Sequence, residues 1–137
     1  MNWKFVTFHQ RDMQTVAGKC SVLECRPGVY ALSLNRKELL CYNASGWDDA
    51  MQRAEAKLLV RANEASSFEL KWKNNWTALT PLGVLTVKLW GDSYKVTLGN
   101  KVIRNIEIIE MHTPHAIRMH AACAFKDLTE NLAAELS

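Results

Sequence analysis

Hydrophobic and polar residues alternate along much of the first half of the chain, as in strands with one buried face. Turn-forming sequences such as "RPG" at 26–28 and "NRKE" at 35–38 separate the alternating segments. The pattern predicts strands at Trp3 to Phe8, Lys19 to Cys25, Val29 to Leu34 and Leu39 to Tyr42.

After the fourth predicted strand, apolar residues recur at spacings of three and four instead of two. This spacing places them in one stripe of an amphipathic helix. The stripe consists of Trp47, Met51, Ala54 and Leu58. The preceding "SGWDD" indicates the helix start, since Ser45 and Asp48 have the spacing of a capping box. A polar break, "ANEASS" at 62–67, follows this helix.

The second half repeats this order of elements. Strands are predicted at Phe68 to Lys73, Val84 to Trp90, Tyr94 to Leu98 and Val102 to Glu110, with hairpin signals at Gly91 and Gly99. Thr113 followed by Pro114 is a typical cap and first helical residue. The last helix then carries an apolar stripe at Ile117, Ala121, Ala124, Leu128 and Leu132.

The two halves also align with each other. "GKCSVLECRPGVYALSLNRK" matches "GVLTVKLWGDSYKVTLGNK" with one residue removed at the turn, which pairs Gly18 with Gly83 and Tyr30 with Tyr94. We therefore predict an α+β fold of two pseudo-repeated units, residues 1–66 and 67–137, each an antiparallel β-meander followed by a helix. A single unit leaves apolar surface exposed, so the two are expected to share one core or one sheet in a compact domain.

Charge is unevenly distributed along the 137 residues. The net charge is only +3, but residues 70–104 hold six Lys or Arg against one Asp, and residues 105–137 hold two against five acids. The sequence "MNWKFVTFHQ" lacks the apolar core of a signal peptide, and no apolar run is long enough to span a bilayer. We expect a cytoplasmic protein that does not contact a membrane, with its four cysteines as reduced thiols.

Residue spacing argues against three kinds of site: a metal centre, a cysteine nucleophile and a pair of catalytic carboxylates. His112, His115, His120 and Cys123 offer zinc ligands, but their spacing around a helix does not bring all four together. Cys20, Cys25 and Cys41 lie in strand patterns typical of small core or near-core residues, and not beside a base. Asp48 and Asp49 fit the first turn of a helix, where negative charge is favourable. We therefore predict that the protein is not an enzyme and has no cofactor or metal.

The basic middle of the chain is the best candidate for a binding surface, because it mixes lysines with tryptophans. Lys73 shares its strand face with Lys71 while Trp72 points the other way, and Lys88 shares a face with Trp90. Such a face can follow a phosphate backbone and stack bases. The alternative is that the tryptophans are core and the lysines a solvated face. The predicted binding residues are Trp72, Lys73, Trp76, Lys88, Trp90, Lys95 and Arg104.

A tryptophan-led strand, the run "VKLWGDSYKV" and a capped helix with an "AxxxA" spacing resemble many small accessory proteins of bacteriophages and mobile elements. The resemblance covers Gly18 to Ala56 and Gly83 to Ala122. Among such proteins it points to anti-CRISPR proteins, and it implies a non-enzymatic inhibitor that occupies a host defence nuclease or ribonucleoprotein. No functional residue carries over, since that class shares no motif. The alternative is direct binding of DNA or RNA by the same sheet face. A monomer and a homodimer are both compatible with the charge pattern.

Overall fold

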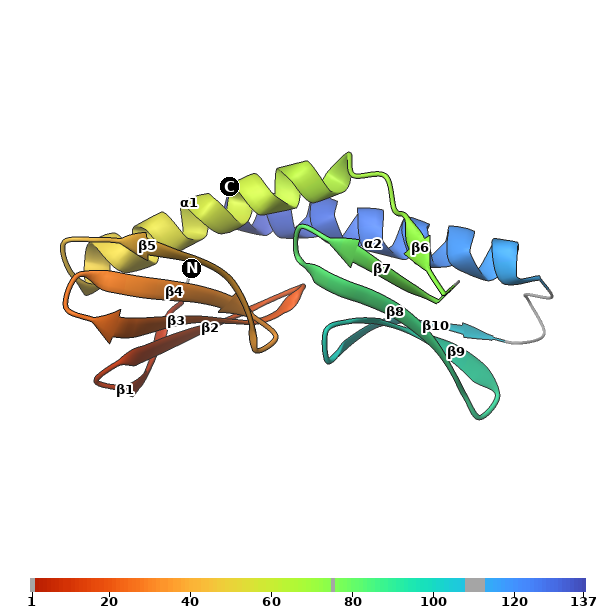
Figure 1. The fold of residues 1–137 in the computed structure, drawn as a ribbon, viewed down its shortest axis with the longest axis horizontal. Coiled ribbons are helices and arrows are strands. Elements are labelled where there is room, and N and C mark those ends of the chain that lie inside the picture. Colours follow the sequence, from red (N-terminus) through yellow and green to blue (C-terminus); the bar gives the residue numbers. More distant parts are fainter. Residues whose placement is uncertain (1, 75, 108–112) are drawn as a thin grey trace.

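Two five-stranded antiparallel sheets, each followed by a long helix, make up the computed structural model (Figure 1). The structure describes residues 2–74, 76–107 and 113–137. Sheet A is a meander in sequence order and is followed by helix α1. Its elements are β1 Lys4–Thr7, β2 Gln10–Thr15, β3 Gly18–Arg26, β4 Val29–Leu34, β5 Lys37–Asn43 and α1 Trp47–Ser66.

Sheet B has the same meander order and is followed by helix α2. Its elements are β6 Trp72–Lys73, β7 Thr77–Thr80, β8 Gly83–Trp90, β9 Ser93–Leu98, β10 Lys101–Glu107 and α2 Pro114–Leu136. The prediction of an α+β fold built from two similar meander and helix units is therefore confirmed.

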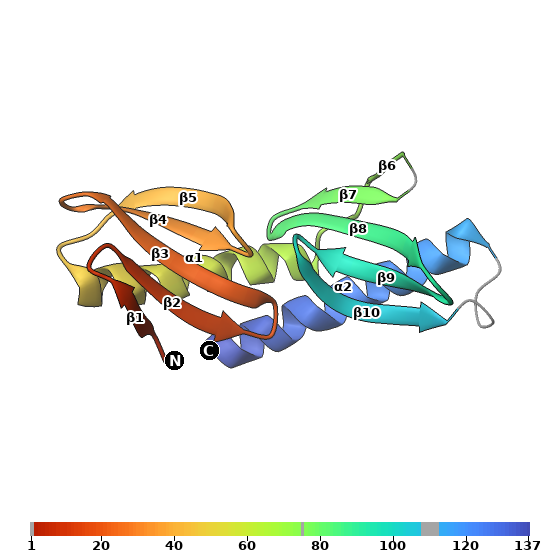
Figure 2. The same ribbon diagram turned by 90° about the horizontal axis from the view of Figure 1, so that it is seen from below.

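The two helices run antiparallel along one side of both sheets, and the sheets lie end to end (Figures 1 and 2). We call this side of each sheet the helix face. The other side carries no element of the described chain, and Figure 2 looks directly onto it. We call it the open face.

One continuous hydrophobic core joins the two units between the helices and the helix faces. Alanines dominate the buried stripe of α1, and their small side chains let the helices and sheets approach closely. The buried residues of α1 are Ala50, Ala54, Leu58, Ala62 and Ala65. Those of α2 are Ile117, Ala121, Ala124, Phe125, Thr129 and Leu132.

The repetition extends to individual hydrogen bonds in the turn between the second and third strand of each sheet. Thr15 Oγ1 donates to Gly18 O at 2.8 Å and accepts from the Ala17 amide at 3.1 Å. Thr80 Oγ1 donates to Gly83 O at 2.7 Å and accepts from the Leu82 amide at 3.1 Å. The matching glycines have φ values of 122° and 127°, a region that side chains disfavour. The same local chemistry therefore builds the same turn twice.

Two strands were not predicted, and they occupy equivalent places in the two sheets. In β2, "QRDMQT", Met13 is the only large apolar residue, although Arg11 also packs against aromatic rings of Phe5 and Trp47. In β7, "TALT", the strand is only four residues long. Neither segment shows a clear apolar alternation, and pairing with β3 and β8 is what makes each one a strand.

Some predicted boundaries are also wrong. The strand predicted at Phe68 to Lys73 is shorter in the structure, because β6 contains only Trp72 and Lys73. Helix α1 continues through the predicted break and ends at Ser66. The capping box predicted at Ser45 and Asp48 is wrong, because Gly46 is the N-cap of α1 and Asp49 Oδ2 accepts from the Ser45 amide at 3.0 Å. The predicted cap of α2 is confirmed, because Thr113 Oγ1 accepts from the Ala116 amide at 3.1 Å. Glu110 and His112 lie outside the described residues.

Candidate functional site

The strand register of sheet B sorts its side chains into rows, because residues opposite each other in an antiparallel pair lie on the same face. The first row on the open face contains Lys73, Thr77, Thr86, Thr97 and the exposed Val102. The next contains Lys88, Lys95 and Asn105, and the last contains Trp90, Ser93 and Glu107. We call these three rows the lysine face.

Two lysines lie directly opposite each other at the centre of this face. Lys88 on β8 is the register partner of Lys95 on β9, and their neighbour on β10 is the neutral Asn105. Like charges in this position destabilise a sheet by a few tenths of a kcal/mol or more. Within residues 2–74, 76–107 and 113–137, no carboxylate lies within 4 Å of either ammonium group. The face therefore carries uncompensated positive charge.

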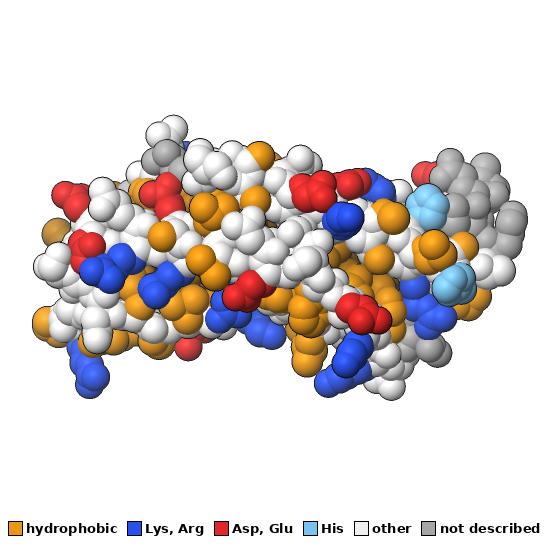
Figure 3. All heavy atoms as spheres, turned by 90° about the horizontal axis from the view of Figure 1, so that it is seen from above, with side chains coloured by type: hydrophobic (Ala, Val, Ile, Leu, Met, Phe, Trp, Pro, Cys, Tyr) orange, Lys and Arg blue, Asp and Glu red, His pale blue; other side chains and the backbone are white. Residues whose placement is uncertain are grey.

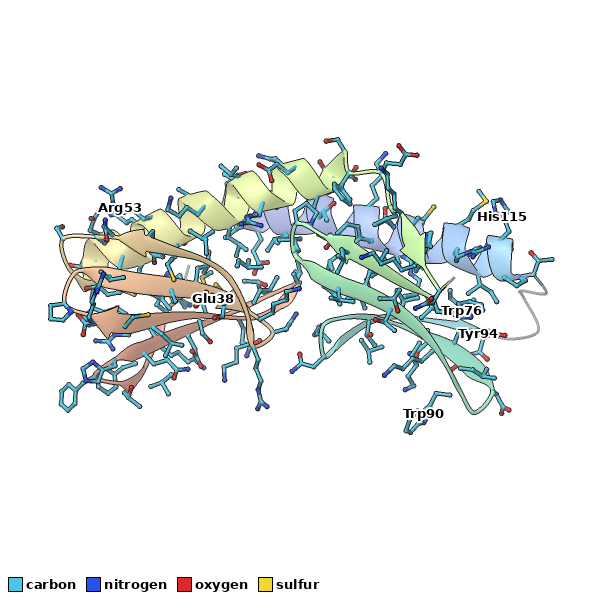
Figure 4. The ribbon with its side chains drawn as sticks, in the orientation of Figure 1. Glu38, Arg53, Trp76, Trp90, Tyr94 and His115 are labelled. Carbon is cyan, nitrogen blue, oxygen red and sulfur yellow. The ribbon has the colours of Figure 1, made fainter. Side chains whose placement is uncertain are left out.

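Trp90 ends β8 on the same face, and 70% of its surface is exposed. Figure 4 shows its ring on the side of the sheet away from the helices. An indole is a large, rigid contact surface that folding normally buries. Here it stands beside the lysine pair, and Glu107 is the one carboxylate in the three rows.

Three of the predicted binding residues lie on the helix face instead. Trp72 pairs with Ala78 and packs against the core, and the Trp76 ring stacks on Tyr94 with 6.2 Å between ring centroids. Figure 4 shows that stacked pair well away from Trp90. These two tryptophans thus follow the structural alternative raised by the sequence.

Arg104 was expected to extend the Lys95 surface and does not. The register of β10 shifts between Val102 and Arg104, so that Arg104 lies opposite Val96 on the helix face. Its guanidinium donates to Asp127 Oδ2 of α2 at 3.3 Å. The structure therefore brings together Lys73, Lys88, Trp90 and Lys95, and it separates Arg104 from them.

Sheet A has different chemistry at the equivalent positions. The row that corresponds to Lys88, Lys95 and Asn105 contains Leu23, Ala31 and Cys41. One lysine elsewhere on this open face is paired, since Lys19 Nζ lies 3.0 Å from Asp12 Oδ2. Partial burial alone would raise the pKa of Asp12, but hydrogen bonds from Gln10, Ser21 and Lys19 outweigh it and hold that pKa below its usual value. The pair of directly opposed lysines is thus a property of sheet B.

The histidine and cysteine cluster does not assemble as one site. His115 and Cys123 line an apolar groove of about 520 Å³ beside α2, together with Phe68, Leu70 and Met119. Hydrophobic side chains of this region reach the surface in Figure 3. His120 is exposed outside that groove, and among the described residues no group of three or more His, Cys, Asp or Glu can hold a metal.

Two of the thiols, Cys20 and Cys41, are poor candidates for nucleophiles. Burial of Cys20 raises its pKa to about 12. Desolvation and the neighbouring Glu38 carboxylate raise the pKa of Cys41 as well. A catalytic cysteine requires the opposite shift, toward the thiolate.

Sequence reasoning overlooked the threonines at 77, 86 and 97 and Asn105, which fill the lysine face between the cations. The signal was present as alternation, since Thr86 and Lys88 in β8, and Lys95 and Thr97 in β9, are spaced by two. Within the described ranges, no helix has the length and apolar character needed to cross a membrane. Comparisons with protein-family models, with curated proteins and with solved structures find no match to this chain.

Proposed function

We propose that this chain is a non-enzymatic protein that binds single-stranded nucleic acid on the lysine face of sheet B. The observation that carries the proposal is the Lys88 and Lys95 pair, which stands beside the exposed indole of Trp90 and has no acidic partner among the described residues.

The lysine pair is not required by the fold. Leu23 and Ala31 occupy the same two positions in sheet A, so the scaffold accepts neutral side chains there. Two cations held side by side repel each other in the free protein, and an anion placed between them removes that repulsion. A polyanion is therefore the class of ligand that best suits the pair.

A single strand suits the face better than a duplex. The major groove of a regular duplex admits a helix or a two-stranded ribbon, and a wide sheet face reaches the bases of a duplex only at the cost of bending it. Unpaired bases can stack on an exposed indole, and the lysines can follow the phosphates, as in proteins that bind single strands without sequence preference. Hydroxyl groups such as those of Thr86 and Thr97 are ordinary donors to phosphate oxygens.

The inhibitor function implied by the resemblance to phage accessory proteins stays a prediction. An acidic protein surface is a second polyanion that such a face could meet, with Trp90 as the anchor. We argue for nucleic acid because the threonine hydroxyls of the lysine face can donate to phosphate oxygens and the Trp90 indole can stack on a base. The experiment below separates the two classes of partner.

The test is a fluorescence-anisotropy titration of labelled 16-nucleotide oligothymidylate and oligouridylate over a series of salt concentrations. The double variant Lys88→Gln/Lys95→Gln removes two phosphate contacts, so the slope of log K against log salt should fall in magnitude by about 1.4. Trp90→Ala should lose about 1–3 kcal/mol of binding free energy through lost stacking. Lys126→Gln, on the exposed side of α2, removes one positive charge away from the lysine face and should bind as wild type.

Either of two results would contradict the proposal. One is an absence of binding to both oligonucleotides at about 50 mM salt, where the electrostatic contribution is strong. The other is a Lys88→Gln/Lys95→Gln variant that binds both as tightly as wild type. Melting curves show whether each variant is folded under the assay conditions. The double variant should have a Tm no lower than that of wild type, because the repulsion between the two lysines is gone.

A further inference from the structure

A hollow of about 370 Å³ is lined by residues of both sheets and lies on the open-face side. The β4–β5 and β9–β10 turns in its lining come together where the two sheets meet (Figure 2). Open-face residues of sheet A such as Ser33 form part of its lining, and the two hairpin turns at the junction supply Asn35, Arg36 and Asn100. Asn35 fixes these turns relative to each other, because its Nδ2 donates to Leu98 O at 3.2 Å. The hollow is thus built by both units.

Arg36 holds an unfavourable backbone conformation at the rim of the hollow. Asn35 and Arg36 form the two-residue turn between β4 and β5, with φ values of 53° and 70°. Such turns favour glycine at the second position, because a side chain there meets the backbone. In the corresponding turn of sheet B, Gly99 stands in the place of Asn35 with a φ of 60°, and Asn100 stands in the place of Arg36 without a positive φ. The arginine at this position therefore costs the fold stability that a glycine would restore.

Some polar side chains around the hollow already have hydrogen-bond or ion-pair partners within the protein, and others do not. Asn35 uses its amide fully, because it also donates to Ala17 O at 2.9 Å and accepts from the Lys19 amide at 3.2 Å. The Lys19 ammonium is paired with Asp12. In the described chain, the side chains of Arg36 and Asn100 have no hydrogen-bond partner and no ion-pair partner. Two donors, one of them charged, are therefore free at the junction.

We propose that this hollow is a second contact point for the strand bound to the lysine face, with Arg36 and Asn100 holding one of its backbone phosphates. The inference rests on the proposed function. A guanidinium binds phosphate through two parallel hydrogen bonds, and an amide adds a third donor. A strand that leaves the lysine face across the junction meets these donors next, so a long oligonucleotide occupies both sheets and a short one occupies sheet B alone.

The test uses Arg36→Gly, which removes the guanidinium and supplies the residue that the turn favours. Oligothymidylates of about 4 and 16 nucleotides cover the range of site sizes known for single-strand binders. We expect the variant to bind the 16-mer about five- to tenfold more weakly, with a salt slope smaller by about 0.7, and to bind the 4-mer as wild type. Its Tm should rise by about 2–4 °C, because the strained conformation is relieved.

If Arg36 instead stabilises the hairpin, Arg36→Gly should lower the Tm. Weaker binding of the 16-mer together with a higher Tm therefore supports a role of Arg36 in binding. Arg36→Asn, which tolerates positive φ and is neutral, is a second variant that keeps the test valid if the glycine perturbs the hairpin. Unchanged binding of the 16-mer by both variants, or an equal loss for the 4-mer, would overturn the second contact point. Failure of the lysine face itself would show separately, as wild-type binding by Lys88→Gln/Lys95→Gln.

Discussion

Asn35 is the residue whose replacement tests the junction between the two sheets most directly. Its side chain makes three hydrogen bonds, two as donor to the carbonyls of Ala17 and Leu98 and one as acceptor from the Lys19 amide. The bond to Leu98 joins sheet A to sheet B. Asn35→Gly removes all three bonds and keeps the positive φ accessible.

The expected loss follows from these bonds and from the exposure of the site. A typical intramolecular hydrogen bond contributes about 1 kcal/mol, and water can replace part of that here because Asn35 is only half-buried. We expect Asn35→Gly to lower the free energy of unfolding by about 2 kcal/mol. Asn35→Ala should lose about 1 kcal/mol more, because alanine also resists the left-handed conformation.

Urea denaturation followed by far-ultraviolet circular dichroism measures both variants, with an unchanged dependence on urea as evidence that the folded state is intact. A matched control is Asn100→Gly, in the facing turn, whose side chain makes no hydrogen bond within the described residues and should cost less than about 0.5 kcal/mol. An Asn35→Gly variant as stable as this control would refute the view that the Asn35 side chain holds the junction.

Two further predictions concern the repeat and the thiols. Gly18→Ala should lower the free energy of unfolding by about 3 kcal/mol, because the added methyl group collides with the Asn35 side chain. In Gly83→Ala the methyl group meets no atom closer than 3.9 Å, so the loss should be only the conformational strain of about 1 kcal/mol. Equal losses for the two variants in urea denaturation would contradict this. Titration with a thiol reagent at pH 8 should modify three cysteines of the native protein, Cys41 more slowly than Cys25, and should reach buried Cys20 only after unfolding. Reaction of all four thiols in the native state would show that the core opens.

Sequence patterns predict this fold well where side chains alternate strongly, as in Val29–Leu34, which the structure confirms at both ends. They fail at β2 and β7, because these strands owe their conformation to hydrogen bonds with β3 and β8 and not to their own apolar residues. The repeat itself helps little there, since both copies are weak at the same place.

The binding face was predictable only where the strand is regular. Lys88 and Trp90 share a face as their spacing of two requires. Arg104 is two residues from Val102, yet a bulge at Ile103 moves it to the helix face. The equivalent strand β5 has an irregularity at the same place, between its pairings of Leu40 and Glu38. A bulge leaves no mark in apolar alternation, so the side of the sheet on which Arg104 lies depends on a pairing that sequence spacing does not reveal.

The two copies differ most where packing constrains them least. On the helix face, Val22 and Leu32 of sheet A correspond to Val87 and Val96 of sheet B, and all four are buried against the helices. Volume and polarity are restricted at such positions, because a buried charge or a cavity costs several kcal/mol.

On the open face, the corresponding comparison sets Leu23 and Ala31 against Lys88 and Lys95. Leu23 is 38% exposed, so a charged side chain there costs the fold little, whereas Ala31 is 2% exposed and a lysine at that position must extend out of the sheet surface to reach water. A duplicated sheet and helix unit can therefore keep one scaffold and differ in what its open faces bind. For that reason, exchanging Leu23 and Ala31 for lysines should give sheet A an affinity for oligothymidylate that wild-type sheet A lacks. A Leu23→Lys/Ala31→Lys protein that stays folded yet binds no additional oligonucleotide would show that the lysine pair alone does not make the site.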